Sequence, residues 1–265
     1  MSNEQSIFTE YVNRYRGMQA TIKGSVSAET FATQLDTALA AWTANGLQLA
    51  WLCLTHEQAN CVPYAVERGF EFHQVQTDDL MLVKQLIDGA FVPSNASHTI
   101  GAGGLVINDK NELLTIVERT ASRPDYFKLP GGTIDEGEHL AAGVMREVLE
   151  ETGVRTEFES IVFVRQTHGD ASHFGKSNFY IICRLRPLSA EITLDPVEIA
   201  KCQWMPVDDY LTHPSVADFE KMIVRSALAT SGFRRGWLPT YTSRPPERCE
   251  FFAPLNVKHF EYEVI

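Results

Sequence analysis

The sequence predicts an α/β (α+β) protein with a small N-terminal domain and a larger second domain. Short apolar or alternating segments, typical of strands, recur along the chain between segments whose apolar residues have helical spacing. A chain of 265 residues is long for one domain and ample for a buried core. The expected parts are a small α/β domain at 1–92, a linker at 93–98, a main domain at 99–215, and a C-terminal helix with an aromatic-rich extension at 216–265.

The small domain is predicted to follow the order helix, strand, helix, strand, strand. Its expected elements are a helix over 29–44, a strand over 47–54, a helix over 57–68 and strands over 70–76 and 80–86. Asn45-Gly46 ends the first helix, and Pro63 weakens the second from its interior. The segment FVPSNASH then has the proline and polar residues of a linker.

The main domain is predicted to alternate strands with helices. Its expected elements are a hairpin of strands over 99–108 and 112–119, a helix over 140–152 and strands over 157–167 and 178–188. A short helix that starts with residues 207–211 and a helix over 218–230 are expected to follow. Asp109-Lys110-Asn111 supplies the hairpin turn. The loop 168–177 carries His168, His173, Phe174 and Lys176, and a loop on a rigid sheet is a common place for binding residues.

The most informative stretch is GTIDEGEHLAAGVMREVLEETGV, residues 132–154. From 140 to 152 there is no proline, and helical spacing at roughly 100° per residue places five apolar residues on one arc that should face a core. These residues are Ala141, Val144, Met145, Val148 and Leu149. Glu147, Glu150 and Glu151 lie off the arc as neighbours, where like charges destabilise by about 0.2–0.5 kcal/mol per pair. Gly153 ends the helix.

This ridge of glutamates needs positive charge. Arg146 lies four residues before Glu150 and supplies one charge against three carboxylates. Mg²⁺ binds through one or two carboxylates together with waters and substrate phosphates, so the ridge indicates phosphate chemistry. Upstream, Leu129-Pro130-Gly131-Gly132 is expected to form a strand end and a tight turn, where glycines let the backbone approach a ligand closely.

Composition narrows the classes of function. With 44% hydrophobic and 22% charged residues the chain is an ordinary soluble protein, and its net charge of −11 argues against broad binding to nucleic acid or anionic membranes. The five cysteines include no C-x-x-C pair and are expected to be reduced and structural. No apolar run reaches transmembrane length and the N-terminus lacks the layout of a signal peptide, so a cytoplasmic location is expected.

The spacing within the stretch is specific. It runs Gly132, five residues, Glu138, seven residues, Arg146-Glu147, an aliphatic, one residue, Glu150-Glu151, one residue, Gly153, an aliphatic. This pattern resembles the Nudix box with every defined position filled. The alternative, an exposed acidic helix with i,i+4 salt bridges, would not require the flanking glycines or Glu138.

The resemblance extends over residues 10–215. AVERGFEFHQ followed by LMLV resembles the pre-Nudix domain, which is similar to half of an acetyltransferase fold. That segment has no Arg/Gln-x-x-Gly-x-Gly/Ala loop for coenzyme A, so a packing or dimerisation role is expected. Four further segments resemble the subfamily of plant ADP-ribose and NADH diphosphatases and of the animal protein encoded antisense to a fibroblast growth factor. They are NASHTIGAGGLVIND, FVRQTH, FGKSNFYIICRLRPLS and EIAKCQWMP.

The resemblance implies a Nudix α/β/α sandwich with a mixed sheet, and metal-assisted hydrolysis of a diphosphate by Mg²⁺ or Mn²⁺. It implies Glu147 and Glu151 as principal metal ligands, assisted by Glu150 and the Gly131 carbonyl, with Arg146 and Glu138 orienting the ridge. The general base varies within the superfamily. It is Glu147 in some members and a glutamate on a later loop in others, for which Glu198 is the candidate.

The substrate is expected to be ADP-ribose or NADH, split into AMP and a second phosphate by a homodimer. The candidate contacts are Arg119, Arg123 or Lys128 for phosphate or ribose, Phe174 or Trp204 for base stacking, and Lys176 in the loop. Two departures leave the substrate open: Gly131-Gly132 replaces the Thr-Gly common in plant members, and the motifs that accompany NADH or ADP-ribose preference elsewhere do not occur. The alternatives are a nucleoside triphosphate pyrophosphohydrolase and a catalytically silent nucleotide-binding protein.

Overall fold

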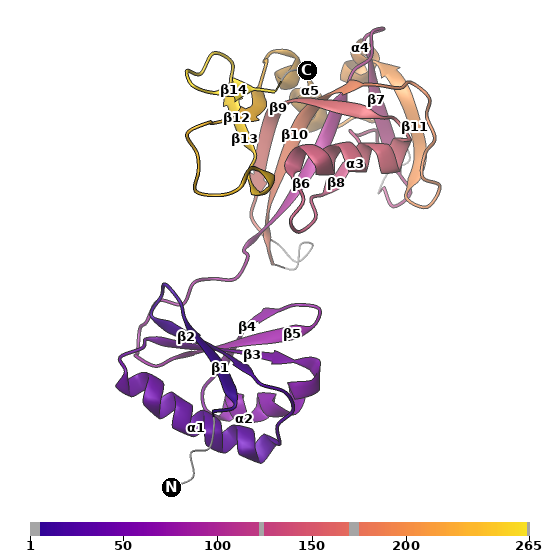
Figure 1. Cartoon of the computed structure of the whole chain (residues 1–265). Coiled ribbons are helices and arrows are strands. Elements are labelled where there is room, and N and C mark those ends of the chain that lie inside the picture. The colour runs from indigo at the N-terminus through magenta and orange to yellow at the C-terminus, as the bar shows by residue number, and fades with distance from the viewer. Residues whose placement is uncertain (1–5, 122–124, 170–174, 264–265) are drawn as a thin grey trace. The chain divides into compact units, whose positions relative to one another are not determined.

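The structure is a computed structural model that describes residues 6–121, 125–169 and 175–263 (Figure 1). The chain divides into two compact units, residues 1–96 and residues 97–265. Each unit has hydrophobic core clusters of its own. In the described ranges no helix is long and apolar enough to cross a membrane.

The first unit is a five-stranded sheet in the order β1-β2-β3-β5-β4, with its helices on one face (Figure 1). Its elements are β1 Phe8–Val12, β2 Gly17–Ile22, α1 Ala28–Ala44, β3 Leu49–Thr55, the 3-10 helix η1 His56–Cys61, α2 Val62–Glu67, β4 Glu71–Val75 and β5 Asp79–Gln85. Phe31 and Leu35 of α1 pack with Leu52 and Leu54 of β3. This packing defines the covered face.

Two expectations for this unit are wrong. The single helix over 57–68 is instead η1 followed by α2, because Pro63 lies in the first turn of α2, where its missing N–H leaves no helical hydrogen bond unmade. The predicted order also omits β1 and β2. Of the five residues of β1 only Phe8 is buried, so that strand lacks the apolar alternation by which a strand is predicted.

The second unit is built around a seven-stranded mixed sheet in the order β13-β12-β9-β10-β6-β8, with β14 paired to β12. A separate two-stranded sheet pairs β11 with β7. The first six strands of this unit are β6 His98–Val106, β7 Glu112–Glu118, β8 Gly131–Thr133, β9 Thr156–Thr167, β10 Ser177–Pro187 and β11 Ile199–Pro206. The remaining elements are α3 Leu140–Thr152, α4 Val207–Thr212, α5 Asp218–Leu228, β12 Phe233–Trp237, the 3-10 helix η3 Pro246–Arg248, β13 Phe251–Pro254 and β14 Glu261–Tyr262.

Helices α3 and α5 cover opposite faces of this sheet. Val106 and Cys183 belong to the core cluster of α3, whereas the preceding residues Leu105 and Ile182 belong to the cluster of α5. Successive residues of a strand point to opposite faces, so the sheet lies between the two helices. The predicted α/β/α sandwich with a mixed sheet is therefore confirmed, as is the small α/β domain before it.

The predicted hairpin is wrong beyond its turn. The turn closes, since the Asn108 N–H donates to the Glu112 carbonyl at 3.0 Å, but β6 and β7 then enter different sheets. The last six residues of β6 are all buried, and the strand runs parallel to β10 on one side and antiparallel to β8 on the other. A strand buried on both faces takes a central place in a sheet.

The C-terminal aromatic residues extend the sheet past β9. Phe233 and Arg234 of β12 pair with β9, and β13 and β14 pair with β12 (Figure 1). The ring of Phe252 lies 5.5 Å from that of Phe158, so the extension adds to the core on the α3 side.

Candidate active site

The acidic helix α3 has the predicted bounds, Leu140–Thr152. Gly153 follows in the left-handed conformation, with a φ of 72°, and its N–H donates to the Leu149 carbonyl at 2.8 Å. Ala141, Val144 and Val148 are fully buried, as the predicted arc requires. Leu149, at the edge of that arc, is 45% exposed, so its assignment to the core is wrong.

Arg146 connects most of the carboxylates around α3. Its Nε and Nη2 donate to the two oxygens of Glu138, both at 2.9 Å, in a bidentate pair. Its Nη1 donates to Glu147 and Glu150, each at 3.0 Å. The hydrogen bond to Arg146 holds the pKa of Glu138 below its usual range. One guanidinium thus fixes three carboxylates.

Glu147 is packed against strand β8, so the tight turn expected at Gly131-Gly132 is wrong: both glycines pair with β6 as part of the sheet. A Cβ on Gly132 would lie 2.4 Å from its Oε2, so any larger residue at that position would displace the Glu147 carboxylate. Burial raises the pKa of Glu147, and the negative charges of Glu150 and Glu198 raise it further. The hydrogen bond and charge of Arg146 act in the opposite direction and lower that pKa. Glu198 itself lies on an exposed loop, within electrostatic reach of Glu147.

Glu151 is the most buried carboxylate of the ridge, with 6% of its surface exposed. Its Oε2 accepts a hydrogen bond of 2.7 Å from the Gly131 N–H. Gly131 has a φ of 147°, and a Cβ there would lie 2.1 Å from the Ala102 carbonyl oxygen. Burial raises the pKa of Glu151 to about 7, opposed by the Gly131 N–H and by Lys128. Glu151 is therefore short of positive charge.

Side chains from distant parts of the unit surround this ridge. Lys128 forms an ion pair with Glu118, and the charges of both act on the pKa of Glu151. The pKa of Tyr180 on β10 is raised by burial, with further contributions from Glu151, Glu220 and Glu118. Through these charges β7 and β10 come next to Glu151, whereas Glu220 of α5 acts on Tyr180.

Arg165 on β9 belongs to the same cluster. Its guanidinium lies 5.3 Å from the ring centroid of Tyr180 and 5.4 Å from that of Phe219, and its charge lowers the pKa of both Tyr180 and Glu220. Its Nε is buried without a hydrogen-bond partner among the described residues. Sequence reasoning did not single out Arg165, Tyr180 or Glu220. For Arg165 the sequence offered one signal, a charged residue that directly follows the apolar residues of the strand FVRQTH.

The other sequence candidates have different surroundings. Arg119 uses its Nε to bind the Pro196 carbonyl at 2.6 Å, and its N–H donates to the Glu198 carbonyl, so it fastens the Glu198 loop to β7. Trp204 donates to the Ala190 carbonyl at 2.9 Å and packs on the α3 side of the core. Lys176 is exposed. Phe174 and His173 lie outside the described residues, as does Arg123.

The carboxylates of α3 are ligands of the chemical type that a hard divalent cation binds, but they do not form a preformed metal site. Within the described ranges no three His, Cys, Asp or Glu side chains are arranged to hold a metal ion. Glu147 and Glu150 instead share Nη1 of Arg146, while burial and neighbouring negative charge act on Glu147 and Glu151. Mg²⁺ binds through carboxylate oxygens and waters, and a cation here would supply positive charge that Arg146 and Lys128 do not fully provide.

Comparison with known proteins agrees with this geometry. Residues 97–225 match the family model of the NUDIX domain, and residues 8–86 match that of the Nudix hydrolase domain. Nudix hydrolase 2 of Arabidopsis thaliana is 36% identical over 253 residues, which cover 93% of this chain and 90% of that protein. The human protein named nucleoside diphosphate-linked moiety X motif 6 is 32% identical over 213 residues, covering 80% of this chain and 67% of its own length.

Among solved structures, a UDP-X diphosphatase matches with a TM-score of 0.42 and 15% identity, over 77% of this chain and 94% of that one. The plant and human relatives confirm the subfamily that the sequence resembles. The chain therefore belongs to the Nudix hydrolase family and is a hydrolase that acts on phosphoric anhydride bonds.

Proposed function

We propose that this enzyme hydrolyses a nucleoside diphosphate linked to another moiety, ADP-ribose or NADH, to AMP and a second phosphate, with Mg²⁺ or Mn²⁺. The observation that carries the proposal is Glu151, a buried carboxylate whose pKa is raised to about 7, beside Glu147 on the same helix. A divalent cation bound at these two carboxylates would supply the balancing positive charge and would also bind a phosphate of the substrate.

The residues that would hold the cation are Glu147, Glu150 and Glu151, with the carbonyl of Gly131. When bound, the cation polarises a phosphoryl oxygen and lowers the pKa of a water molecule. Arg146 keeps Glu138, Glu147 and Glu150 in fixed positions through four hydrogen bonds, and a fifth goes to the Thr133 carbonyl. Glu138 acts through Arg146 and sets the direction of the guanidinium.

The proton of the attacking water needs a general base, for which two groups are available. Glu147 hydrogen bonds to Arg146, which favours its charged form. The exposed Glu198 is held near Glu147 by the contact of its own backbone with Arg119. If Glu198 is the base, Glu198→Gln lowers kcat by about 10²–10⁴-fold. A loss of less than about tenfold would leave the role to Glu147.

For the substrate we propose Lys128 and Arg165 as phosphate contacts. Arg165 has an unused buried donor, and Lys128 and Arg165 both act electrostatically on the same cluster of carboxylates. Phe174 and Lys176 stay candidates for contacts with the base and with phosphate. Arg119 is assigned instead to holding the Glu198 loop, since its Nε is already bonded to a backbone carbonyl.

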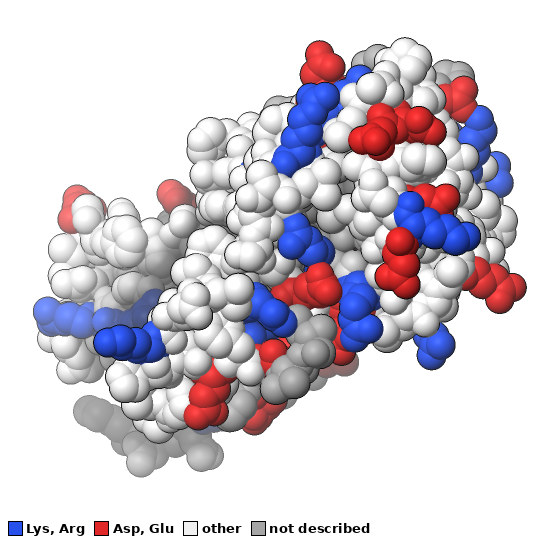
Figure 2. Space-filling view, turned by 90° about the horizontal axis from the view of Figure 1, so that it is seen from above, with Lys and Arg blue, Asp and Glu red and all other residues white. Residues whose placement is uncertain are grey.

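The proposal also covers the oligomeric state, the cellular location and the partners of the enzyme. We propose a homodimer, with the first unit in a packing or dimerisation role, and a cytoplasmic location. Nucleic acid is not an expected partner: Figure 2 shows acidic and basic side chains interspersed over the face in view, without the one-sign surface that phosphate backbones favour.

Product identification tests the proposal. The protein is incubated with Mg²⁺ and, in separate reactions, with ADP-ribose, NADH, coenzyme A and a set of nucleoside triphosphates, with Glu147→Gln as the control. AMP from ADP-ribose or NADH, absent with the variant, is the expected result. Pyrophosphate from a triphosphate alone would favour the pyrophosphohydrolase alternative, and full turnover by Glu147→Gln would contradict the role given to the ridge.

A further inference from the structure

A basic pocket lies on the face of the main sheet opposite α3. It has a volume of about 410 Å³, and its lining residues are Glu159, Ser160, Arg184, Arg186, Ser231, Arg234 and Leu255. Three arginines and one glutamate give this lining a positive balance, in a protein whose net charge is −11. The pocket belongs to the second unit and shares no residue with the acidic ridge.

The sheet itself brings two of the arginines together. Ser160 on β9 is directly opposite Arg184 on β10 and directly opposite Arg234 on β12. Directly opposed residues have Cβ atoms about 4.5–5.5 Å apart and project to one face, so the two guanidinium groups flank one serine. Arg186, two residues further along β10, projects to that face as well. Like charges gathered in this way repel each other unless an anion lies between them.

Two of the arginines are anchored. Arg184 donates from Nη2 to the Ala227 carbonyl at the end of α5 and to the Thr230 carbonyl at 3.0 Å, which leaves its Nε and Nη1 donors for another acceptor. Arg186 is paired with Glu157. Arg234 has no hydrogen bond or ion pair from its side chain to any described residue.

Ser160 supplies the second observation. The residue is 2% exposed, and its hydroxyl has no hydrogen-bond partner among the described residues. A buried hydroxyl without a partner is unfavourable, because it has lost its hydrogen bonds to water and gained none. An oxyanion held between Arg184 and Arg234 would offer that hydroxyl an acceptor and would separate the two charges.

We propose that this pocket binds a phosphate-bearing small molecule, inorganic phosphate or a phosphate monoester, at Ser160, Arg184 and Arg234. Arginine presents several N–H donors in a planar fork that matches phosphate oxygens. The volume exceeds what one phosphate fills, so the pocket has room for the organic part of a monoester. The site is separate from the ridge and does not depend on which anhydride the enzyme cleaves.

Isothermal titration calorimetry of the full chain tests the proposal. Metal is removed with a chelator, and inorganic phosphate, AMP and adenosine are titrated separately. We expect phosphate or AMP to bind with a dissociation constant on the order of 1 mM or tighter and adenosine not to bind. The comparison uses only the binding that Arg234→Gln removes, since AMP can also bind at the ridge as a product. Within that part, AMP binding more tightly than phosphate would identify a monoester pocket, and equal affinities would identify a site for phosphate itself.

The variants decide whether this pocket is responsible. Arg234→Gln should weaken binding by at least about tenfold, because it removes a charged donor that no other described group uses. The matched control is Arg155→Gln, an exposed arginine outside the pocket, which should bind as the wild type does. Ser160→Ala should weaken binding and, without ligand, raise the melting temperature, since it removes the unpaired hydroxyl.

Three results would overturn the proposal. They are no saturable binding of phosphate or AMP up to about 10 mM, unchanged affinity in Arg234→Gln when that variant has the wild-type melting temperature, and adenosine binding as tightly as AMP. None of these measurements uses turnover, so failure of the proposed hydrolysis would leave this test unaffected.

Discussion

Arg146 determines how the carboxylates of α3 are arranged, since it donates to Glu138 twice and to Glu147 and Glu150 once each. Lysine keeps the charge but cannot form the bidentate pair with Glu138. We therefore expect Arg146→Lys to lower kcat by about 10–100-fold, as loss of a group that orients ligands does. Steady-state kinetics at saturating Mg²⁺ measure this, with Arg155→Lys as the control. Unchanged kcat would show that the guanidinium fork does not orient the ridge.

Arg165 is the residue we expect to matter most for substrate binding. Its Nε is buried without a partner among the described residues, and its guanidinium faces the rings of Tyr180 and Phe219. A hydrogen bond to a charged group contributes about 1.5–3 kcal/mol, so Arg165→Gln should raise KM about tenfold or more while kcat changes little. The same kinetics measure it. A fall in kcat at constant KM would instead place Arg165 with the groups that orient the ridge.

We expect Glu220 on α5 to make stability depend on pH. Burial raises the pKa of this carboxyl above its ordinary value of 4.5, against the charges of Arg165 and Lys128. The folded state then holds a proton that the unfolded state releases, so this contribution to stability is complete below pH 4.5 and is lost as the pH rises through the raised pKa. Glu220→Gln should flatten that decline and be more stable than the wild type at pH 8.

Urea unfolding between about pH 4 and pH 8, in chelator, measures the dependence. Glu191→Gln, an exposed carboxylate in the loop before β11, is the matched control and should keep the wild-type slope. A slope in Glu220→Gln as steep as that of the wild type would assign the pH dependence to other carboxylates.

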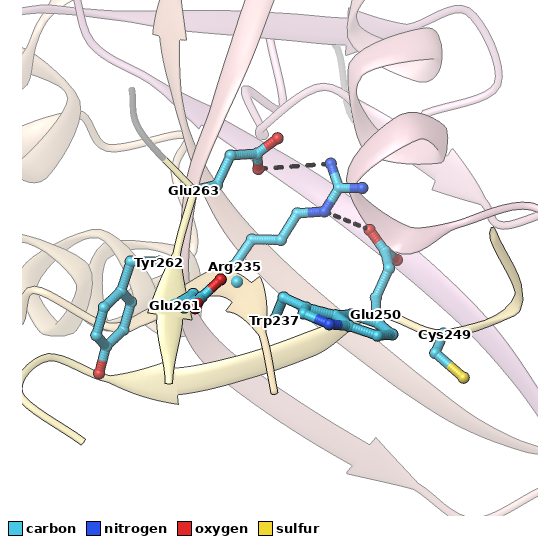
Figure 3. Close-up of a pocket in the computed structure, with 8 residues that line it drawn as sticks. Arg235, Trp237, Cys249, Glu250, Glu261, Tyr262 and Glu263 are labelled. Carbon is cyan, nitrogen blue, oxygen red and sulfur yellow. Dashed lines mark ion pairs between the residues drawn. The ribbon is translucent and has the colours of Figure 1, made fainter. Parts of the chain in front are cut away.

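At the scale of elements, the C-terminal strands hold the start of α3. His139, the residue before the helix, contacts the Glu247 carbonyl through Nε2 at 2.9 Å, and its Nδ1 lies 3.5 Å from Glu250. Figure 3 shows Arg235 of β12 between Glu250 and Glu263, to which it is paired at 3.3 and 3.5 Å. A chain of contacts thus connects the extension to the residue next to Glu138.

We expect His139 to be a positioning residue. His139→Ala should lower the free energy of unfolding by about 1 kcal/mol, the usual contribution of a hydrogen bond. It should also lower kcat by about tenfold, with KM unchanged, because the start of α3 is no longer held. His139→Gln keeps a donor for the Glu247 carbonyl and should restore most of kcat. Unfolding and kinetics are measured together, with His56→Ala in the first unit as the control. Loss of stability with full kcat would make the contact purely structural.

Elements whose signals are local were predicted well. Helix α3 was predicted with its observed bounds because its periodicity and its glycine stop lie within its own sequence. The hairpin of β6 and β7 failed because the partners of β6 are β10 and β8, chosen by burial on both of its faces, which a turn signal does not report.

The same distinction applies to the candidate site. The spacing of the glutamates in one helix was enough to predict the ridge, because its members lie within one turn of each other. Arg165, Tyr180 and Glu220 come from β9, β10 and α5, and only the sandwich brings Arg165 and Glu220 to Tyr180 and Tyr180 to Glu151. The sequence around each of these residues does not indicate that they lie close together in the fold.

At the scale of the whole molecule, the two units have separate hydrophobic cores. The core clusters of residues 1–96 contain no residue of the second unit, and those of 97–265 contain none of the first. All the groups assigned to the site lie in 97–265. A unit with its own core is expected to fold alone. We therefore expect the fragment 97–265 to unfold cooperatively and to hydrolyse substrate with a kcat within about threefold of the full chain.

The fragment also tests the proposed role of the first unit. Light scattering after size-exclusion chromatography should give a dimer for the full chain and a monomer for 97–265, if the first unit carries the dimer contact. Retained kcat with loss of the dimer is the outcome that a packing or dimerisation role requires. A fragment that is folded and monomeric but has lost its preference among ADP-ribose, NADH and the triphosphates would contradict that role, because the first unit would then contribute to choosing the substrate.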